Sequence, residues 1–166
     1  MLALLLLLDS LYESPRVSIA VLFRTANVRF FLLQILHMMI TDGAAGTVLS
    51  GSDGLAAQRA TETTEGLADL GGPQLLDLPD GKLAGAAEAD AWIAALIKGA
   101  APDLIVTHAP EDYHPDHRAL SKNVTDAAGF ICPVLFADTL MGVGFIPDFY
   151  VDITPFIEAK MSAIGA

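Results

Sequence analysis

The sequence predicts an α/β fold in which a mostly parallel β-sheet is covered by helices on both faces, as a three-layer sandwich. Two observations predict it. Short apolar runs of strand length alternate along the 166-residue chain with stretches of helix length. Some of these runs, such as LALLLLL and DLIVTH, are nearly continuous, which is typical of strands buried on both faces of a parallel sheet.

Proline, glycine and aspartate separate the expected elements. Pro15 suits the start of a helix, Gly71-Gly72-Pro73 is a combined helix stop, and Asp80-Gly81 is typical of a turn. Strands are expected at residues 2–8, 30–40, 75–79, 103–108 and 131–138. Helices are expected at residues 15–27, 56–70, 87–99, 114–128 and 155–164. The third helix has an apolar face formed by Trp92, Ile93, Leu96 and Ile97.

Composition excludes several classes of protein. Nine Lys and Arg residues against 20 Asp and Glu residues give a net charge of −11. Nucleic acids and anionic membrane surfaces are bound by clustered cations, so this balance disfavours both partners. The hydrophobic content of 53% excludes general disorder. Since the length fits one domain and no repeat or linker is present, we expect a single domain over residues 1–166.

The apolar runs near the N-terminus are short for membrane spans. MLALLLLL has eight residues without the positive flank of a signal peptide, and FFLLQILHMMI has eleven. A bilayer span needs roughly 20 residues, so we expect strands here, with membrane attachment as the weaker alternative. Cys132 is the single cysteine, which excludes an intrachain disulfide and suits a reducing, cytoplasmic compartment. Its apolar surroundings in sequence indicate a buried core position.

The stretch EDYHPDHRAL, residues 111–120, is the strongest candidate for a functional site. Two of the four histidines, His114 and His117, follow the strand expected at 103–108. Pro115 suits the first position of a helix, so His114 would cap that helix and His117 would lie in its first turn. Both imidazoles would then face the edge where parallel strands end and ligands bind. A polar capped turn would show the same spacing, so spacing alone does not separate it from a metal or acid–base site.

Other polar residues are weaker candidates. His108 ends a strand six residues before His114 and could face the same crevice as a substitute ligand. His37 lies inside an apolar run and suits a hydrogen-bonded position in the core. Gly43 and Gly46 are typical of a turn, since no G-x-G-x-x-G or P-loop pattern is present.

Several segments between residues 41 and 160 match one known family in its order. The block PDLIVTHAPEDYHPDHRALSKNVTDAA contains a His-Pro-Asp-His motif, and TDGAAG resembles the turn after a second strand. Arg59 and Glu62, followed by LADLG, resemble an Arg-x-x-Glu helix, while LLDLPDGKL and GFIPDFYVDITPFIEAK resemble later stretches. Together they resemble the LmbE-like, or PIG-L, family of zinc-dependent N-deacetylases. This resemblance implies a Rossmann-like α/β fold.

The resemblance also implies hydrolysis of an acetamido group on an N-acetylglucosamine-type sugar or its conjugate, with zinc or another divalent metal as cofactor. Zinc polarises the amide carbonyl and lowers the pKa of bound water to about 7. By the family's motif, His117 would bind the metal, His114 would be the general acid and Asp116 would orient the neighbouring histidine. Arg59 and Asp112 would contact the substrate, and the role of Asp112 is the less defined of the two.

The first expected strand departs from the family's pattern. The family has His-Pro-Asp-Asp there, whose histidine and second aspartate bind zinc and whose first aspartate is the base. A gap-free alignment places Leu7, Leu8, Asp9 and Ser10 at these positions. Asp9 would therefore be the retained base, while two of the three zinc ligands are missing. Since catalytic zinc normally has three protein ligands, we expect zinc binding to be weak or absent.

Two classes of function follow. The chain is either a metal-dependent deacetylase with an altered metal site or a non-catalytic relative that binds a sugar or is purely structural. The intact His-Pro-Asp-His motif and Asp9 favour the enzyme, and the missing ligands favour the relative. A third interpretation is that residues 1–40 are not the family's natural segment, and the family also extends beyond the length of this chain. A homo-oligomer is compatible with each of these.

Overall fold

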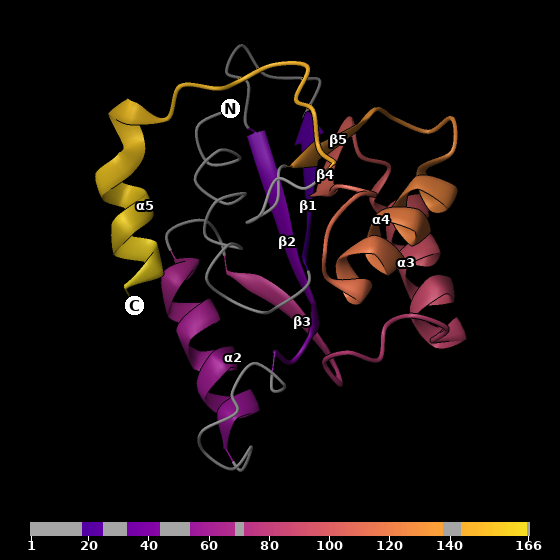
Figure 1. The fold of residues 1–166 in the computed structure, drawn as a ribbon, viewed down its shortest axis with the longest axis horizontal. Helices are drawn as coiled ribbons and strands as arrows, with labels where there is room; N and C mark the ends of the chain where they lie inside the picture. Colours follow the sequence, from indigo (N-terminus) through magenta and orange to yellow (C-terminus); the bar gives the residue numbers. More distant parts are fainter. Residues whose placement is uncertain (1–17, 25–32, 44–53, 69–71, 138–143, 166) are drawn as a thin grey trace.

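The centre of the molecule is a five-stranded sheet with the strand order β3-β2-β1-β4-β5 (Figure 1). The computed structural model describes residues 18–24, 33–43, 54–68, 72–137 and 144–165. The strands are β1 Ser18–Arg24, β2 Leu33–Thr41, β3 Pro73–Leu78, β4 Leu104–His108 and β5 Val134–Ala137.

Four of the five strands point the same way. β2 pairs with β3 and β4 pairs with β5 in parallel, whereas β1 is antiparallel to both β2 and β4. In the antiparallel register Ser18 lies opposite Met39 and Ala20 lies opposite Val106. β1 therefore begins at the end of the sheet where β2 and β4 finish, and β1 finishes at the opposite end of the strands.

The helix expected at residues 15–27 is wrong over its described part, because residues 18–24 form β1. This stretch contains the β-branched Ile19 and Val21 and the aromatic Phe23, residue types that favour strands. β1 also pairs with a strand on each side, and this pairing overrides the helix start that Pro15 indicates. The strand expected at residues 2–8 lies outside the described residues.

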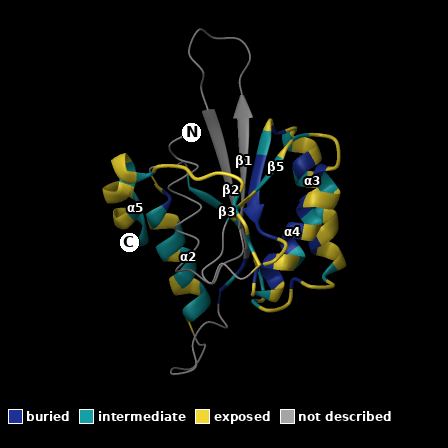
Figure 2. Cartoon of the chain, turned by 45° about the horizontal axis from the view of Figure 1, so that its top comes forward, coloured by how far each residue is buried: buried dark blue, intermediate teal, exposed yellow. Residues whose placement is uncertain are grey.

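The helices form an outer layer on each side of the sheet, so the predicted α/β sandwich with mostly parallel strands is confirmed. Figures 1 and 2 show α2 and α5 on one face and α3 and α4 on the other. The bounds are α2 Leu55–Gly66, α3 Ala87–Ala100, α4 Pro115–Ala128 and α5 Ile157–Ile164, with a short 3-10 helix, η2 Thr154–Phe156, before α5. No helix within the described ranges is both long and apolar enough to cross a bilayer.

The hydrophobic core lies where α3 and α4 pack on the sheet, and Figure 2 shows the buried residues, in dark blue, gathered there. The predicted apolar face of α3 is confirmed, because Ile93 and Ile97 are fully buried while Trp92 and Leu96 pack partly buried against the same cluster. Cys132 also packs against this cluster, although it is half-buried rather than fully enclosed. The remaining fully enclosed members are Leu83, Ala89, Ile105, Leu120, Val124 and Ala128.

The opposite face is packed differently. Neither α2 nor α5 contains a buried residue. Their backbones nevertheless come close at Gly66, where an added Cβ would overlap the carbonyl oxygen of Ala163. A glycine is needed there because only hydrogen fits between the two helices.

Candidate metal centre

The segment from the end of β4 to the first turn of α4 carries most of the polar side chains that the sequence singles out. β4 ends at His108, and α4 begins at Pro115 with His114 as its N-cap. The Nδ1 atom of His114 accepts a hydrogen bond from the backbone N–H of Asp116 (3.3 Å). The predicted cap, with proline at the first helical position and His117 in the first turn, is therefore confirmed.

Three buried side chains meet beneath this cap. His108, Asp112 and His117 are 6%, 2% and 8% exposed. Oδ2 of Asp112 lies 2.8 Å from Nδ1 of His117 and 3.9 Å from Nδ1 of His108. The two imidazole rings stack with their centroids 3.9 Å apart and their planes 13° apart. One potential ligand atom from each residue lies within 4.8 Å of the other two, so this cluster could bind a metal.

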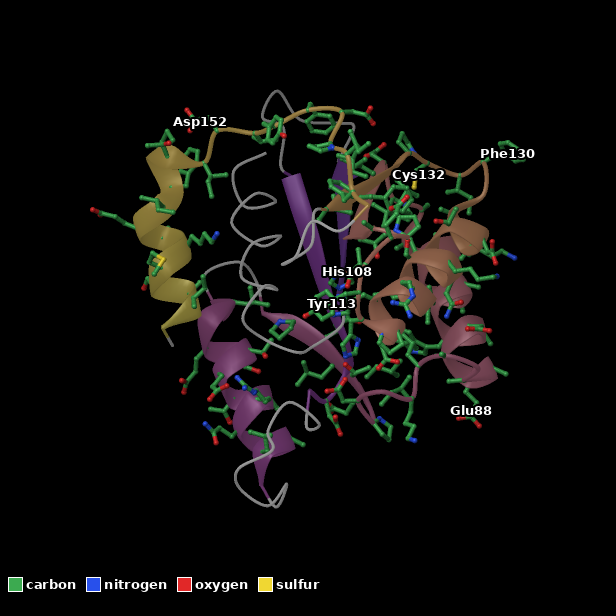
Figure 3. The ribbon with its side chains drawn as sticks, in the orientation of Figure 1. Glu88, His108, Tyr113, Phe130, Cys132 and Asp152 are labelled. Atoms are coloured by element: carbon green, nitrogen blue, oxygen red, sulfur yellow. The ribbon has the colours of Figure 1, made fainter. Side chains whose placement is uncertain are left out.

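Backbone hydrogen bonds hold the cluster's loop in place. Oδ1 of Asp112 accepts from the N–H of His114 (2.8 Å), so both carboxylate oxygens are engaged within this segment. Nη1 of Arg118 donates to the carbonyl oxygens of Asp112 and Tyr113, both at 2.7 Å. Figure 3 shows His108 and Tyr113 close together beside the start of α4. These bonds therefore hold the end of the loop that leads into α4.

The electrostatics keep the ring of His108 neutral and the carboxylate of Asp112 charged. Burial, together with the nearby His117 and His114, lowers the pKa of His108 to about 3 against the opposing charge of Asp112. Burial raises the pKa of Asp112, but hydrogen bonds from the His117 ring and the His114 N–H, together with the charges of His117 and His108, outweigh burial and lower it. Neutral imidazole and ionised carboxylate are the forms that bind metal ions.

The free nitrogen of His117 tests whether the residues fit a metal. Its Nε2 atom is buried and has no hydrogen-bond partner among the described residues. Since Nδ1 faces Asp112, the hydrogen bond to that carboxylate fixes the ring with Nε2 left as a lone-pair donor. Histidines that bind metals commonly donate a hydrogen bond from the N–H of their other ring nitrogen to a carboxylate in this way. The two imidazoles are ligands that zinc uses in catalytic sites, and the Asp112 carboxylate supports one of them, so the residues fit.

Asp116 is fully buried, and its side chain contacts a different loop. Its Oδ2 accepts from the N–H of Gly81 (2.6 Å) and its Oδ1 from the N–H of Leu83 (3.1 Å), both just after β3. The N–H of Asp80 in the same loop donates to Oδ1 of Asp42, which follows β2 (3.0 Å). These bonds join the loops after β2 and β3 to the first turn of α4. The contact of Asp116 with His114 is made by its backbone N–H and not by its carboxylate, so the orienting role of Asp116 stays a prediction.

The remaining predicted site residues lie apart from the cluster or outside the described ranges. Arg59 lies on α2 and pairs with Glu62 of the same helix (3.1 Å). Its contact with substrate stays a prediction, as does that of Asp112, whose carboxylate is enclosed by its neighbours. Asp9, the predicted base, lies outside the described residues.

Sequence reasoning left the partnership of Asp112 with two histidines unrecognised. It treated His108 as a substitute ligand and Asp112 as a substrate contact, each on its own. The spacing of the three residues, four positions and then five, contained the signal. A short turn in which the N–H of Asp112 bonds to the carbonyl oxygen of Ala109 (3.2 Å) brings them together.

The fold and this cluster define a Rossmann-like α/β protein with a candidate metal centre at the carboxyl ends of its strands. The sequence model of PIG-L, GlcNAc-PI de-N-acetylase, matches residues 33–128, and the chain belongs to this family. The match begins at Leu33, the first residue of β2, so β1 lies outside it. No curated protein sequence matches the chain.

Two solved structures share the fold. N,N'-diacetylchitobiose deacetylase from Pyrococcus horikoshii, solved with its inhibitor MPG, superposes with a TM-score of 0.63 at 24% identity, over 76% of this chain and 56% of that chain. The conserved protein TT1542 from Thermus thermophilus gives a TM-score of 0.61 at 24% identity, over 76% of this chain and 62% of that chain. The chain therefore spans less than two thirds of the length of either structure.

Proposed function

We propose that this protein is a metal-dependent hydrolase that removes the acetyl group from an N-acetylglucosamine-type sugar or its conjugate. One observation carries the proposal. In a chain of the PIG-L family, the buried His108, Asp112 and His117 cluster lies directly beneath His114 at the start of α4. Zinc is the metal that this set of donors favours.

A bound zinc ion would supply Lewis acidity that polarises the amide carbonyl and makes hydroxide available near neutral pH. The chain's own residues hold and orient the reacting groups. Asp112 fixes the ring of His117 through the 2.8 Å hydrogen bond, and the Arg118 side chain fixes the loop that carries Asp112. The carboxylate of Asp112 is thus a positioning group for His117.

His114 has the geometry of a proton donor. Its Nδ1 accepts from the Asp116 N–H, so the neutral ring carries its proton on Nε2. The ring is half-buried and its centroid lies 4.7 Å from that of His117. Nε2–H could therefore donate a hydrogen bond to the substrate carbonyl oxygen, and a ring that has taken up the proton released by the attacking water could pass a proton from Nε2 to the leaving amine. Beside it, Tyr113 is 48% exposed and offers an aromatic wall to a sugar ring.

Asp9 remains our proposed general base, and the topology supports this assignment. β1 begins at Ser18, at the same end of the strands where β4 finishes with His108. Eight residues lie between Asp9 and Ser18, and an extended chain covers up to about 3.4 Å per residue. A base that precedes β1 can thus reach the cluster, whereas one that followed Arg24 would start from the far edge.

Amine release tests the proposal. The purified protein, with and without added zinc, would be incubated with N-acetylglucosamine, N,N'-diacetylchitobiose and an N-acetylglucosaminyl-phosphatidylinositol. We expect zinc-dependent release from at least one substrate, and a His114→Ala loss of about 100- to 10,000-fold, the usual contribution of a general acid. Zinc-loaded protein that releases amine from none of the three would contradict the proposal.

A non-catalytic role in binding amino sugars is the second candidate. It is favoured by the family match, which begins only at Leu33 and so omits the strand that carries two metal ligands in the family. Calorimetric titration with the same sugars separates the two candidates. Sugar binding without amine release would support the second one.

A further inference from the structure

We propose that His108 is a metal ligand and that this protein's metal centre is contained within residues 108–117. This inference rests on the metal dependence in the proposed function and specifies the residues that supply it. His108 ends β4, and its ring lies 3.9 Å from that of His117. The centre thus uses one strand end and one helix start, and it needs neither β1 nor the residues that precede β1.

Burial and contacts distinguish His108 from an ordinary core histidine. Its ring is 6% exposed, and its Nδ1 lies 3.9 Å from the same Asp112 oxygen that bonds to His117. A second histidine nearby, His117, has a buried Nε2 without a hydrogen-bond partner in the described part of the chain. In a purely structural cluster of buried polar groups, a hydrogen-bond donor would face that nitrogen. In a metal site the nitrogen's lone pair is left to bind the ion.

The donors also indicate the class of ion. Imidazole nitrogens favour zinc and its neighbours among the transition metals, whereas magnesium and calcium favour oxygen ligands. Two imidazoles that flank one carboxylate therefore fit a zinc-type ion. If His108 were only a structural ring stacked on His117, the protein would not prefer zinc-type ions over magnesium or calcium on account of His108.

The stacked rings make a further prediction. An imidazole binds a metal through a lone pair in the plane of its ring, and the two planes here differ by only 13°. Two nearly parallel rings on top of each other cannot both direct a lone pair at one ion. At least one ring must turn, so metal binding should break the stack between His108 and His117.

Cobalt titration of the full chain tests the assignment directly. In His108→Cys a thiolate replaces the imidazole, and a cobalt-bound thiolate gives a charge-transfer absorption in the near ultraviolet. We expect this band in cobalt-loaded His108→Cys and its absence in cobalt-loaded wild type, which contains only Cys132. Cobalt-loaded His108→Cys without the band would overturn the assignment.

Zinc affinity, measured by competition with a chelating dye, provides the second readout. We expect His108→Gln to weaken binding by at least about 10-fold, while the matched control His37→Gln, at the remaining histidine on β2, leaves it unchanged. An affinity of His108→Gln within about twofold of wild type, with His117→Ala abolishing binding, would overturn the role of His108 and leave the proposed activity standing. Binding that depends on His108 without any amine release would instead support this centre and contradict the proposed activity.

Discussion

The two faces of the sheet differ in how they are held together. On the face of α3 and α4, aliphatic side chains are fully enclosed, and a network of buried carboxylates and histidines lies beside them. On the face of α2 and α5, neither helix contains a buried residue, and the two backbones come close at Gly66. The candidate site is therefore built on the well-packed face, where a buried polar group that loses its hydrogen-bond partner lowers the free energy of unfolding.

The neighbouring strands β1 and β4 show the same contrast within the sheet. β4 delivers His108 to the site at its carboxyl end, whereas β1 runs the other way and ends at Arg24 on the far edge. The family match includes β4 and excludes β1. The segment that contains the site therefore lies within the matched part of the chain.

Lowering the pH should have the largest effect, and it acts on the face of α3 and α4. The folded pKa of His108, about 3, lies below its ordinary value of 6.5, so the unfolded chain binds this proton first. The stability that His108 contributes is complete above about pH 6.5 and is lost as the pH falls toward 3, on the order of 5 kcal/mol in all. The lowered pKa of Asp112 adds a loss in the same direction below its ordinary 3.8. Urea unfolding of the metal-free protein across this pH range measures the loss of stability. A His108→Gln variant whose stability has the same pH dependence as wild type would contradict the role given to His108.

Replacing Asp112 by asparagine should have the next largest effect. One amide NH₂ must then face either the N–H of His114 or the ring of His117, so a buried donor loses its acceptor. We expect a loss of about 3 kcal/mol in the free energy of unfolding, together with weaker zinc binding. Asp126→Asn is the matched control, since Asp126 forms an exposed pair with Lys122 and should leave stability nearly unchanged. Equal effects of the two substitutions would show that the Asp112 network contributes nothing special.

Asp116→Asn tests the bonds that join α4 to the loop after β3. Its NH₂ group would face the N–H of either Gly81 or Leu83, and we expect a loss of about 2 kcal/mol in urea unfolding. Asp42→Asn is the control, because an amide oxygen can still accept the hydrogen bond from the Asp80 N–H. A larger loss for Asp42→Asn than for Asp116→Asn would reverse the expected ranking of these two contacts.

Gly66→Ala probes the other face and should have the smallest effect. The added methyl group overlaps the Ala163 carbonyl, which costs about 1–3 kcal/mol, and the better helix propensity of alanine offsets up to about 1 kcal/mol of it. Gly99→Ala on α3 is the control, because nothing lies within 4 Å of its added Cβ, and it should be stabilising. Thermal melts of both variants measure the change in stability. A stabilising Gly66→Ala would show that α5 does not pack against α2 as described.

The sequence predicted the well-packed face better than the rest. Local signals sufficed for α4, whose start follows from His114 and Pro115, and for the buried stripe of α3 at Ile93 and Ile97. They failed at residues 18–24, where an apolar run is compatible with helix or strand and pairing on both sides decides. The cluster was only partly predictable, because the meeting of His108 with Asp112 depends on how the loop closes.

A crystal soaked with zinc and measured at the zinc absorption edge tests the central claim most directly. We expect an anomalous peak next to Nε2 of His117, with the ring of His108 as a second ligand and Asp112 still hydrogen-bonded to Nδ1 of His117. The stack of the two imidazoles should be open in that structure. A zinc ion bound elsewhere, or bound by His117 with His108 still stacked and uncoordinated, would contradict a metal centre contained within residues 108–117.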